Sequence, residues 1–360
     1  MRQLFRYDPV IGWRYIAGLQ ARVPHPGGGY LLHTNPQGFR CRHDFDGADH
    51  GSPRVLLFGD SCTAGEGVSD GRRYGEIAGA AGGVEVFNLA IPGTGPDQQY
   101  LTWREAAAGR RADAVVVAIW VENIRRVVSH FRWFRDGRGG EQLFAKPWFE
   151  LIDGRLSLHG SPPAARPVAI DSLNETERTH IAQRARLEWT RPLMDRARTH
   201  PLLGRLDVTR RVVEPVQRVA RYQPVPEYAN GDDVAWRLLS AIVEAWAGEL
   251  DVPMLIMPLP FRHHVTGIAD PSPYQARYHE LAAACGAAYL DPLEAFAGLS
   301  RDERRDLYFA DDGHPTARWH AIVGAALAPE LARLCAPATP QRSTPTVDLR
   351  DPAPFPAAPR

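Results

Sequence analysis

Five short apolar runs, each followed by a turn or a helical pattern, constrain this chain more than any other feature of its sequence. The runs are Val55–Asp60, Val84–Ile91, Ala114–Val121, Val252–Pro260 and Ala287–Pro292. Most of them do not alternate between polar and apolar residues, which is typical of parallel strands covered on both faces. Helical patterns are found at Arg72–Ala81, Asp97–Gly109, Asp232–Leu250, Pro273–Cys285 and Thr316–Leu334. We therefore predict a three-layer α/β/α domain of the flavodoxin-like type with a five-stranded parallel sheet.

A long insertion interrupts this alternation inside the predicted domain, which we place at residues 52–335. Residues 135–224 separate the third predicted strand from the fourth and are long enough to form a cap. Within them, Asp153-Gly154 between alternating residues predicts a β-hairpin. The stretch Thr176–Thr199 is polar, rich in arginine and helical in pattern. We expect the insertion to cover a site at the carboxyl edge of the sheet, where loops carry specificity.

The two ends of the chain lie outside the predicted domain. Residues 1–51 are expected to form an N-terminal extension packed on the core. Residues 336–360 are rich in proline and have no apolar periodicity, so we expect a disordered tail. The N-terminus lacks the apolar stretch of a signal peptide, and the longest apolar run, Ala114–Val121, is far shorter than the roughly 18 residues of a membrane span. The sequence therefore predicts a cytoplasmic protein without a membrane partner.

The composition argues against nucleic-acid binding and against a metal centre. The chain has 42 Lys+Arg and 42 Asp+Glu, so it lacks the basic charge that nucleic-acid binding needs. Its four cysteines have no spacing typical of a disulfide framework or a zinc site; they are Cys41, Cys62, Cys285 and Cys335. We predict no metal and no cofactor, and the sequence leaves the oligomeric state open.

A candidate nucleophile follows the first predicted strand, where the chain reads Gly59-Asp60-Ser61. A hydroxyl at the carboxyl end of a parallel strand lies beside the N-terminus of the next helix. Backbone N–H groups there stabilise developing negative charge. Serine is a weak nucleophile and needs a base. Taken alone, Ser61 is equally well explained as the cap of the following helix.

The candidate base is His314, in the segment Asp311-Asp312-Gly313-His314 before the last predicted helix. A carboxylate three residues before the histidine can orient the imidazole and stabilise its protonated form. Asp311 has that spacing, whereas Asp312 is expected to face solvent. His314 precedes a helix and Ser61 ends a strand, so both are expected at the same edge of the sheet.

These two segments resemble the first and last sequence blocks of the SGNH (GDSL-type) hydrolase superfamily. The segment Asn88–Gly95 is similar to the glycine block of that family, and Trp120–Asn123 is similar to its asparagine block. Val121 stands where the family usually has glycine, and Ile124 stands where an aspartate commonly follows the asparagine. The four blocks occur in the family order and span most of the predicted domain.

The resemblance implies a role for each matching residue. Ser61, His314 and Asp311 would form a catalytic triad. The oxyanion hole would be made by the N–H groups of Ser61 and Gly93 and by the side-chain amide of Asn123. One such donor is typically worth about 3–4 kcal/mol of barrier. A purely structural role is the alternative for two of these residues, since Gly93 could serve only a turn and Asn123 only a helix cap.

The N-terminal segments Tyr7–Arg14 and His33–Arg40 resemble a leader found before the serine block in bacterial SGNH proteins. Many of those proteins are linked to polysaccharide or other glycan modification. The resemblance therefore implies a glycan or another small molecule as the substrate.

Several further residues are candidates for substrate binding. His263 and His264 follow the fourth predicted strand, and a solvated position at the rim is the alternative for both. Trp120 is a candidate for stacking on a sugar ring, although aromatic residues are more often core. Arg40 is a candidate for binding an anionic group. Cys62, next to the serine, is expected to be a packed core residue.

Three functions remain open from the sequence. The leading one is a serine ester hydrolase that removes a small acyl group, such as acetyl, from a sugar or glycoconjugate through an acyl-enzyme. The second is an O-acyltransferase with the same triad. The third is a catalytically idle binding module on the same fold.

Overall fold

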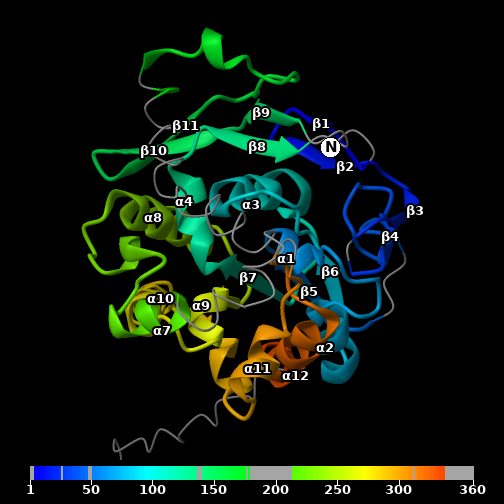
Figure 1. Cartoon of the computed structure of the whole chain (residues 1–360). Coiled ribbons are helices and arrows are strands. Elements are labelled where there is room, and N and C mark those ends of the chain that lie inside the picture. Colours follow the sequence, from blue (N-terminus) through cyan, green and yellow to red (C-terminus); the bar gives the residue numbers. More distant parts are fainter. Residues whose placement is uncertain are drawn as a thin grey trace, which may run out of the picture.

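The computed structural model of the chain describes residues 4–25, 27–47, 51–135, 140–175, 177–178, 213–310 and 313–336 (Figure 1). The predicted helix over Thr176–Thr199 lies outside these residues except for positions 177 and 178. Residues 337–360 of the predicted tail lie outside them as well.

The centre of the fold is a five-stranded parallel sheet, as predicted. Its strands are β5 (Arg54–Phe58), β6 (Glu85–Asn88), β7 (Ala114–Trp120), β12 (Met254–Leu259) and β13 (Ala288–Tyr289). They are arranged in the order β13-β12-β7-β5-β6, and every neighbouring pair is parallel. In chain order this is 2-1-3-4-5, the flavodoxin-like order. The edge strand β13 has only two residues and is much shorter than the apolar run Ala287–Pro292 predicts.

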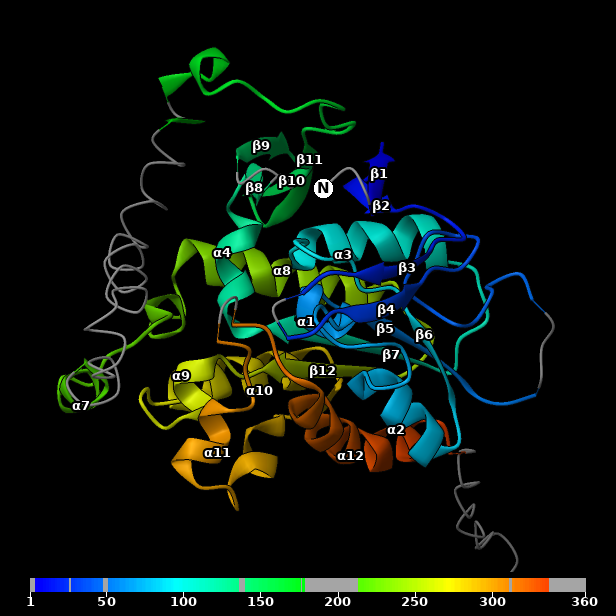
Figure 2. The same cartoon turned by 45° about the vertical axis from the view of Figure 1, so that its right-hand side comes forward.

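Helices cover both faces of the sheet, which gives the predicted three layers. One face packs against α2 (Tyr74–Gly82) and α12 (Ala317–Leu334). The other packs against α3 (Pro96–Thr102), α8 (Val234–Gly248) and α10 (Ser272–Ala284). Figure 2 shows α3 and α8 above the sheet and α2 and α12 below it.

Short helices complete the described part of the domain. They are α1 (Ser61–Ala64), α4 (Ile124–Val127), α7 (Glu214–Val219), α9 (Arg262–Val265) and α11 (Arg301–Arg305). The helix predicted to reach Gly109 instead widens into a π-helical turn at Trp103–Ala107. Across the described ranges, no helix is long and apolar enough to span a membrane.

The N-terminal extension contains two antiparallel hairpins that the sequence does not predict. They pair β1 (Phe5–Asp8) with β2 (Gly12–Tyr15), and β3 (Gln20–Val23) with β4 (Tyr30–His33). The indole N–H of Trp13 donates a hydrogen bond to the carbonyl oxygen of Pro92 at 2.8 Å. Trp13 is fully buried, so the extension is anchored on the loop that follows β6.

The insertion between β7 and β12 opens with two more hairpins. They pair β8 (Phe131–Arg135) with β9 (Glu141–Ala145), and β10 (Trp148–Ile152) with β11 (Arg155–His159). Ile152 pairs with Arg155, which confirms the hairpin predicted at Asp153-Gly154. Figure 1 shows these hairpins beyond α3 and α8, and β10 contacts both helices.

A buried ion pair attaches the insertion to the core. The ammonium of Lys146 pairs with the carboxylate of Asp97 in the first turn of α3, and both side chains are buried. Lys146 is the only lysine of the chain. Asp97 lies two residues beyond Gly95, so the pair ties the insertion to the start of the helix that follows the loop contacted by Trp13.

Candidate active site

Ser61 is the first residue of α1, directly beyond the carboxyl end of β5. The cap of this helix is Asp60, whose carboxylate accepts a hydrogen bond from the Cys62 N–H at 3.0 Å. Ser61 is therefore not the cap, which removes the structural role that the sequence left open for it. The turn into the helix is tight, because a Cβ on Gly59 would lie 2.1 Å from the hydroxyl oxygen of Thr63.

His314 lies against this serine. Its Nε2 is 3.0 Å from Ser61 Oγ, within hydrogen-bonding distance. Backbone bonds hold the loop that presents it: the Phe309 N–H donates to the His314 carbonyl oxygen at 2.9 Å, and the Thr316 N–H donates to the Leu307 carbonyl oxygen at 2.8 Å. The structure thus brings together two groups that are 253 residues apart in the chain.

Asp311 and Asp312 lie outside the described residues. The role of Asp311 beside His314 therefore stays a prediction. Its loop is described on both sides, up to residue 310 and again from Gly313.

Asn123 reaches the nucleophile turn from the end of β7. Its Nδ2 donates to the Asp60 carboxylate at 2.9 Å, and the side chain is fully buried. Although Asn123 precedes α4, its side chain makes no helix-capping bond. Arg126 also donates to Asp60, at 3.1 Å. The carboxylate beside Ser61 therefore links the end of β5 to the end of β7.

The loop of residues 89–95 between β6 and α3, here called the glycine loop, is bonded to the same turn. The Ile91 N–H donates to the Gly59 carbonyl oxygen at 3.2 Å, and Arg126 donates to the Thr94 carbonyl oxygen at 2.7 Å. Gly93 has a φ of +82°, a conformation that residues other than glycine adopt at a cost. A Cβ there would lie 3.0 Å from the ring of Phe134. Glycine at position 93 is thus required by both backbone conformation and space.

Two aromatic side chains from outside the α/β core support this loop. Trp13 of the extension and Phe134 of the insertion meet edge to face, with ring centroids 4.9 Å apart. Both lie against Gly93. The sequence alone assigns neither residue a role, although Trp13 lies in the N-terminal segment that resembles the family leader.

The position of the site in the sheet agrees with a general rule for open α/β sheets. Ligands bind at the carboxyl ends of strands, where the strand order reverses direction. In this sheet the reversal lies between β5 and β7, the first and third strands in chain order. Ser61 follows β5 and Asn123 follows β7, so both lie at this point.

A third polar group, absent from the sequence predictions, faces the pair. Glu66 Oε2 lies 3.4 Å from His314 Nε2, the nitrogen that also faces Ser61. In the sequence, the segment Gly65-Glu66-Gly67 stands out only for its glycines. The carboxylate is five residues beyond the serine, so the turn after α1 returns it to the site.

Arg40 does not bind an anionic substrate group as the sequence suggested. It is completely buried. Its guanidinium donates to the carboxylate of Asp70 and to four backbone carbonyl oxygens, those of Leu31, Ala64, Gly65 and Val68. We therefore assign it a structural role: it binds the carbonyl groups at the end of α1 and so supports the turn that carries Ser61.

The three other substrate-binding candidates are buried to different degrees. His264 is 5% exposed and lies against Tyr274, and burial lowers its pKa to about 4. Trp120 is 6% exposed and packs edge to face on Phe261. His263 stacks on Phe261, and burial lowers its pKa to about 4 as well. Trp120 and His264 are therefore core residues, which corrects their assignment to substrate binding, whereas His263 is only partly buried and its role in substrate binding stays a prediction.

Cys62 is a core residue, as expected. It is 5% exposed, and burial raises the pKa of its thiol well above the ordinary value. A protonated, buried thiol is inert as a nucleophile.

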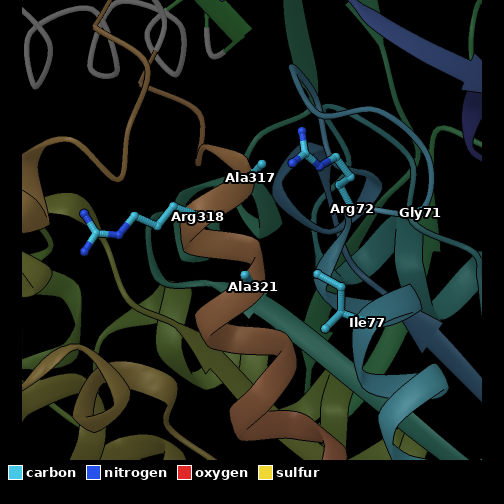
Figure 3. Close-up of a pocket in the computed structure, with 6 residues that line it drawn as sticks. All are labelled: Gly71, Arg72, Ile77, Ala317, Arg318 and Ala321. Atoms are coloured by element: carbon cyan, nitrogen blue, oxygen red, sulfur yellow. The ribbon is translucent and has the colours of Figure 1, made fainter.

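Within the described ranges, no group of three or more His, Cys, Asp or Glu side chains is arranged to hold a metal ion. A depression of about 360 Å³ lies between α2 and α12; its lining residues are Gly71, Arg72, Ile77, Ala317, Arg318 and Ala321. Figure 3 shows the Arg318 side chain pointing away from Arg72, so the two guanidinium groups do not converge on one ligand. The depression includes none of the site residues.

No protein-family model and no curated protein matches the chain. Among solved structures it is similar to an α/β-hydrolase enzyme from the metagenome of Lake Arreo, Spain, at 13% identity and a TM-score of 0.40, over 80% of this chain and 97% of that one. It is also similar to a member of the lipolytic G-D-S-L family from Veillonella parvula, at 12% identity and a TM-score of 0.38, over 78% and 97% of the two chains. A third similar structure is an acetylxylan esterase from Geobacillus stearothermophilus, at 13% identity and a TM-score of 0.39, over 78% and 94%.

Proposed function

We propose that the chain is a carboxylic ester hydrolase of the SGNH type, with Ser61 as nucleophile and His314 as general base. The observation that carries the proposal is the 3.0 Å contact between Ser61 Oγ and His314 Nε2 at the point where the strand order reverses. Serine paired with a base at hydrogen-bonding distance is the arrangement that activates a hydroxyl for acyl transfer.

In this mechanism His314 takes the proton of Ser61 as its oxygen attacks the ester carbonyl. The N–H groups of Ser61 and Gly93 and the amide of Asn123 bind the resulting oxyanion. An amide nitrogen carries two hydrogens. One of those on Asn123 is held by Asp60, which leaves the other for the oxyanion.

Collapse of the intermediate breaks the bond to the alcohol, and His314 gives the proton to the departing oxygen. An acyl-enzyme on Ser61 remains. Water then attacks it with His314 again as the base, and the carboxylic acid leaves. The carboxylate of Asp311 would orient the imidazole throughout.

We further propose a small acyl group, such as acetyl, carried by a sugar or glycoconjugate. The packing of Phe134 against Gly93 supports a small group, because it fills space beside the position where the carbonyl would bind. The N-terminal segment that resembles the leader of glycan-modifying SGNH proteins supports the sugar.

Acetate release from an aryl acetate and from an acetylated sugar tests the proposal. Ser61→Ala and His314→Ala should each lower turnover by orders of magnitude, and the double variant should be little worse, because the two residues act as one unit. Ser240→Ala, at a partly exposed serine of α8, is the matched control and should retain activity. An active Ser61→Ala protein, shown to be free of contaminating esterase, would refute the proposal.

Mass spectrometry of the products separates the hydrolase from the O-acyltransferase. A hydrolase yields free acetate in the presence of a sugar acceptor. Transfer of the acetyl group to the acceptor as the main product would instead identify a transferase that uses the same residues.

A further inference from the structure

The carboxylate of Glu66 lies beside the two reacting groups and has no part in the mechanism above. Its Oε2 is 3.4 Å from His314 Nε2, and Ser61 Oγ is 3.0 Å from the same nitrogen. The Glu66 side chain is 38% exposed, the His314 side chain is 22% exposed and Ser61 is 7% exposed. Glu66 is thus the most exposed of the three side chains and lies on the solvent side of the pair.

Backbone hydrogen bonds fix the turn that carries Glu66. The N–H groups of Gly65 and Glu66 both donate to the Ser61 carbonyl oxygen, at 2.9 and 3.0 Å. Gly65 and Gly67 have φ values of +76° and +83°. The turn that carries Glu66 is therefore bonded directly to the nucleophile.

Packing leaves Glu66 as the one position of this turn with room for a side chain. A Cβ on Gly65 would lie 2.5 Å from the side chain of Arg73. A Cβ on Gly67 would lie 2.6 Å from Phe309 and 3.0 Å from His25. Arg73 packs against the turn at Gly65, and Phe309 and His25 pack against it at Gly67. Glu66 lies between these two contacts.

The mechanism of ester cleavage indicates which part of the substrate would lie next to Glu66. His314 Nε2 passes its proton to the departing alcohol oxygen, so that oxygen must lie within hydrogen-bonding reach of Nε2. A group that lies 3.4 Å from Nε2 on the solvent side therefore borders the alcohol part of the ester. An ionised carboxylate accepts hydrogen bonds and donates none.

We infer that Glu66 selects the alcohol part of the substrate by accepting a hydrogen bond from a free hydroxyl next to the ester. This inference rests on the proposed ester hydrolase function. The favoured substrates are esters of polyols, in which a free hydroxyl is attached to the carbon next to the acylated carbon. An alcohol part that carries negative charge is disfavoured, because it would face the carboxylate.

A pair of simple esters isolates this contact. The acetate of ethylene glycol, 2-hydroxyethyl acetate, offers a free hydroxyl next to the ester, whereas 2-methoxyethyl acetate has the same chain with the hydroxyl capped. Hydrogen bonds to charged groups are worth enough to change kcat/KM by about 10- to 100-fold. Glu66→Ala should lower kcat/KM by that factor for the hydroxyl ester and by less than about threefold for the methoxy ester.

The variants and controls separate the possible outcomes. Glu66→Gln keeps an acceptor oxygen without the charge, so its loss on the hydroxyl ester should be intermediate. Glu330→Gln, a carboxylate on α12 that pairs with Arg333, is the control and should change neither rate. Thermal melting should be alike for all variants, since Glu66 is partly exposed.

An equal loss on both esters, or no loss, would overturn the inference, because Glu66 would then act on His314 or not at all. Such a result leaves the proposed hydrolase intact. The proposed hydrolase fails separately, through an active Ser61→Ala protein.

Discussion

Replacing His320 by glutamine should make the stability of the protein less sensitive to acid. His320 lies on α12 and is fully buried. Its Nδ1 accepts a hydrogen bond from the Tyr74 N–H at 3.2 Å, and its ring stacks on Tyr74. Burial, together with the charges of Arg73 and Arg40, lowers its pKa from 6.5 to about 3. The folded protein therefore holds this imidazole neutral at neutral and mildly acidic pH.

The sign and size of the effect follow from proton linkage. Between pH 6.5 and about 3 the unfolded chain binds a proton at His320 that the folded protein does not. Stability is therefore fully present above the unfolded pKa and is lost as the pH falls. Between pH 7 and pH 5, one such histidine removes about 2 kcal/mol from the free energy of unfolding. His264, with a pKa of about 4 and 5% exposure, adds a similar loss.

Urea unfolding at pH 7 and pH 5 measures the loss in the free energy of unfolding between the two pH values. His320→Gln should lose about 2 kcal/mol less between the two pH values than the wild type, whatever its stability at pH 7. Glutamine can still accept the bond from Tyr74. His279→Gln, at an exposed position on α10, is the control and should behave as the wild type. An equal acid-induced loss in His320→Gln and wild type would show that His320 is not held neutral by the fold.

Two further predictions concern the glycine loop and its neighbours. Asn123→Ala should lower kcat by about 10²- to 10³-fold with a smaller effect on KM, because one oxyanion donor is lost. Steady-state kinetics on an aryl acetate measure both constants. An unchanged kcat with a raised KM would contradict this prediction. Lys146→Met should cost about 3–5 kcal/mol in urea unfolding, because it leaves the buried Asp97 carboxylate without its partner, and Lys146→Met combined with Asp97→Leu should recover most of that loss. Equal destabilisation in the single and double variants would rule out an uncompensated charge as the cause.

The sheet and the meeting of Ser61 with His314 could be predicted because each part has a signal in a short stretch of sequence. Each buried strand is a nearly continuous apolar run, since both of its faces are covered. The Asp153-Gly154 hairpin follows from turn chemistry alone. Ser61 and His314 are expected together because carboxyl ends of parallel strands and the following helix starts share one edge of the sheet. That rule needs no knowledge of side-chain packing.

The roles of Arg40 and Glu66 could not be predicted, because each depends on contacts between distant segments. Arg40 resembles any other arginine in a chain that has 42 Lys+Arg. Only the folded chain shows that its guanidinium binds the carbonyl groups at the end of α1. In the sequence, Glu66 is distinguished only by the glycine on each side of it. Its distance to His314 depends on a loop more than 240 residues away. Likewise, the short hairpins β1–β4 have no strong apolar pattern and are fixed by what they pack on.

The sheet and the segments outside it position different parts of the site. The sheet edge supplies Ser61 and Asn123, and their relative position is fixed by the parallel pairing of β5 and β7. The glycine loop, by contrast, is held by Trp13 from the N-terminal extension and by Phe134 from the insertion. Changes in either segment would therefore move the glycine loop without disturbing the contact between Ser61 and His314. For the proposed hydrolase, substrate choice would then change through the extension and the insertion while Ser61 and His314 keep their positions.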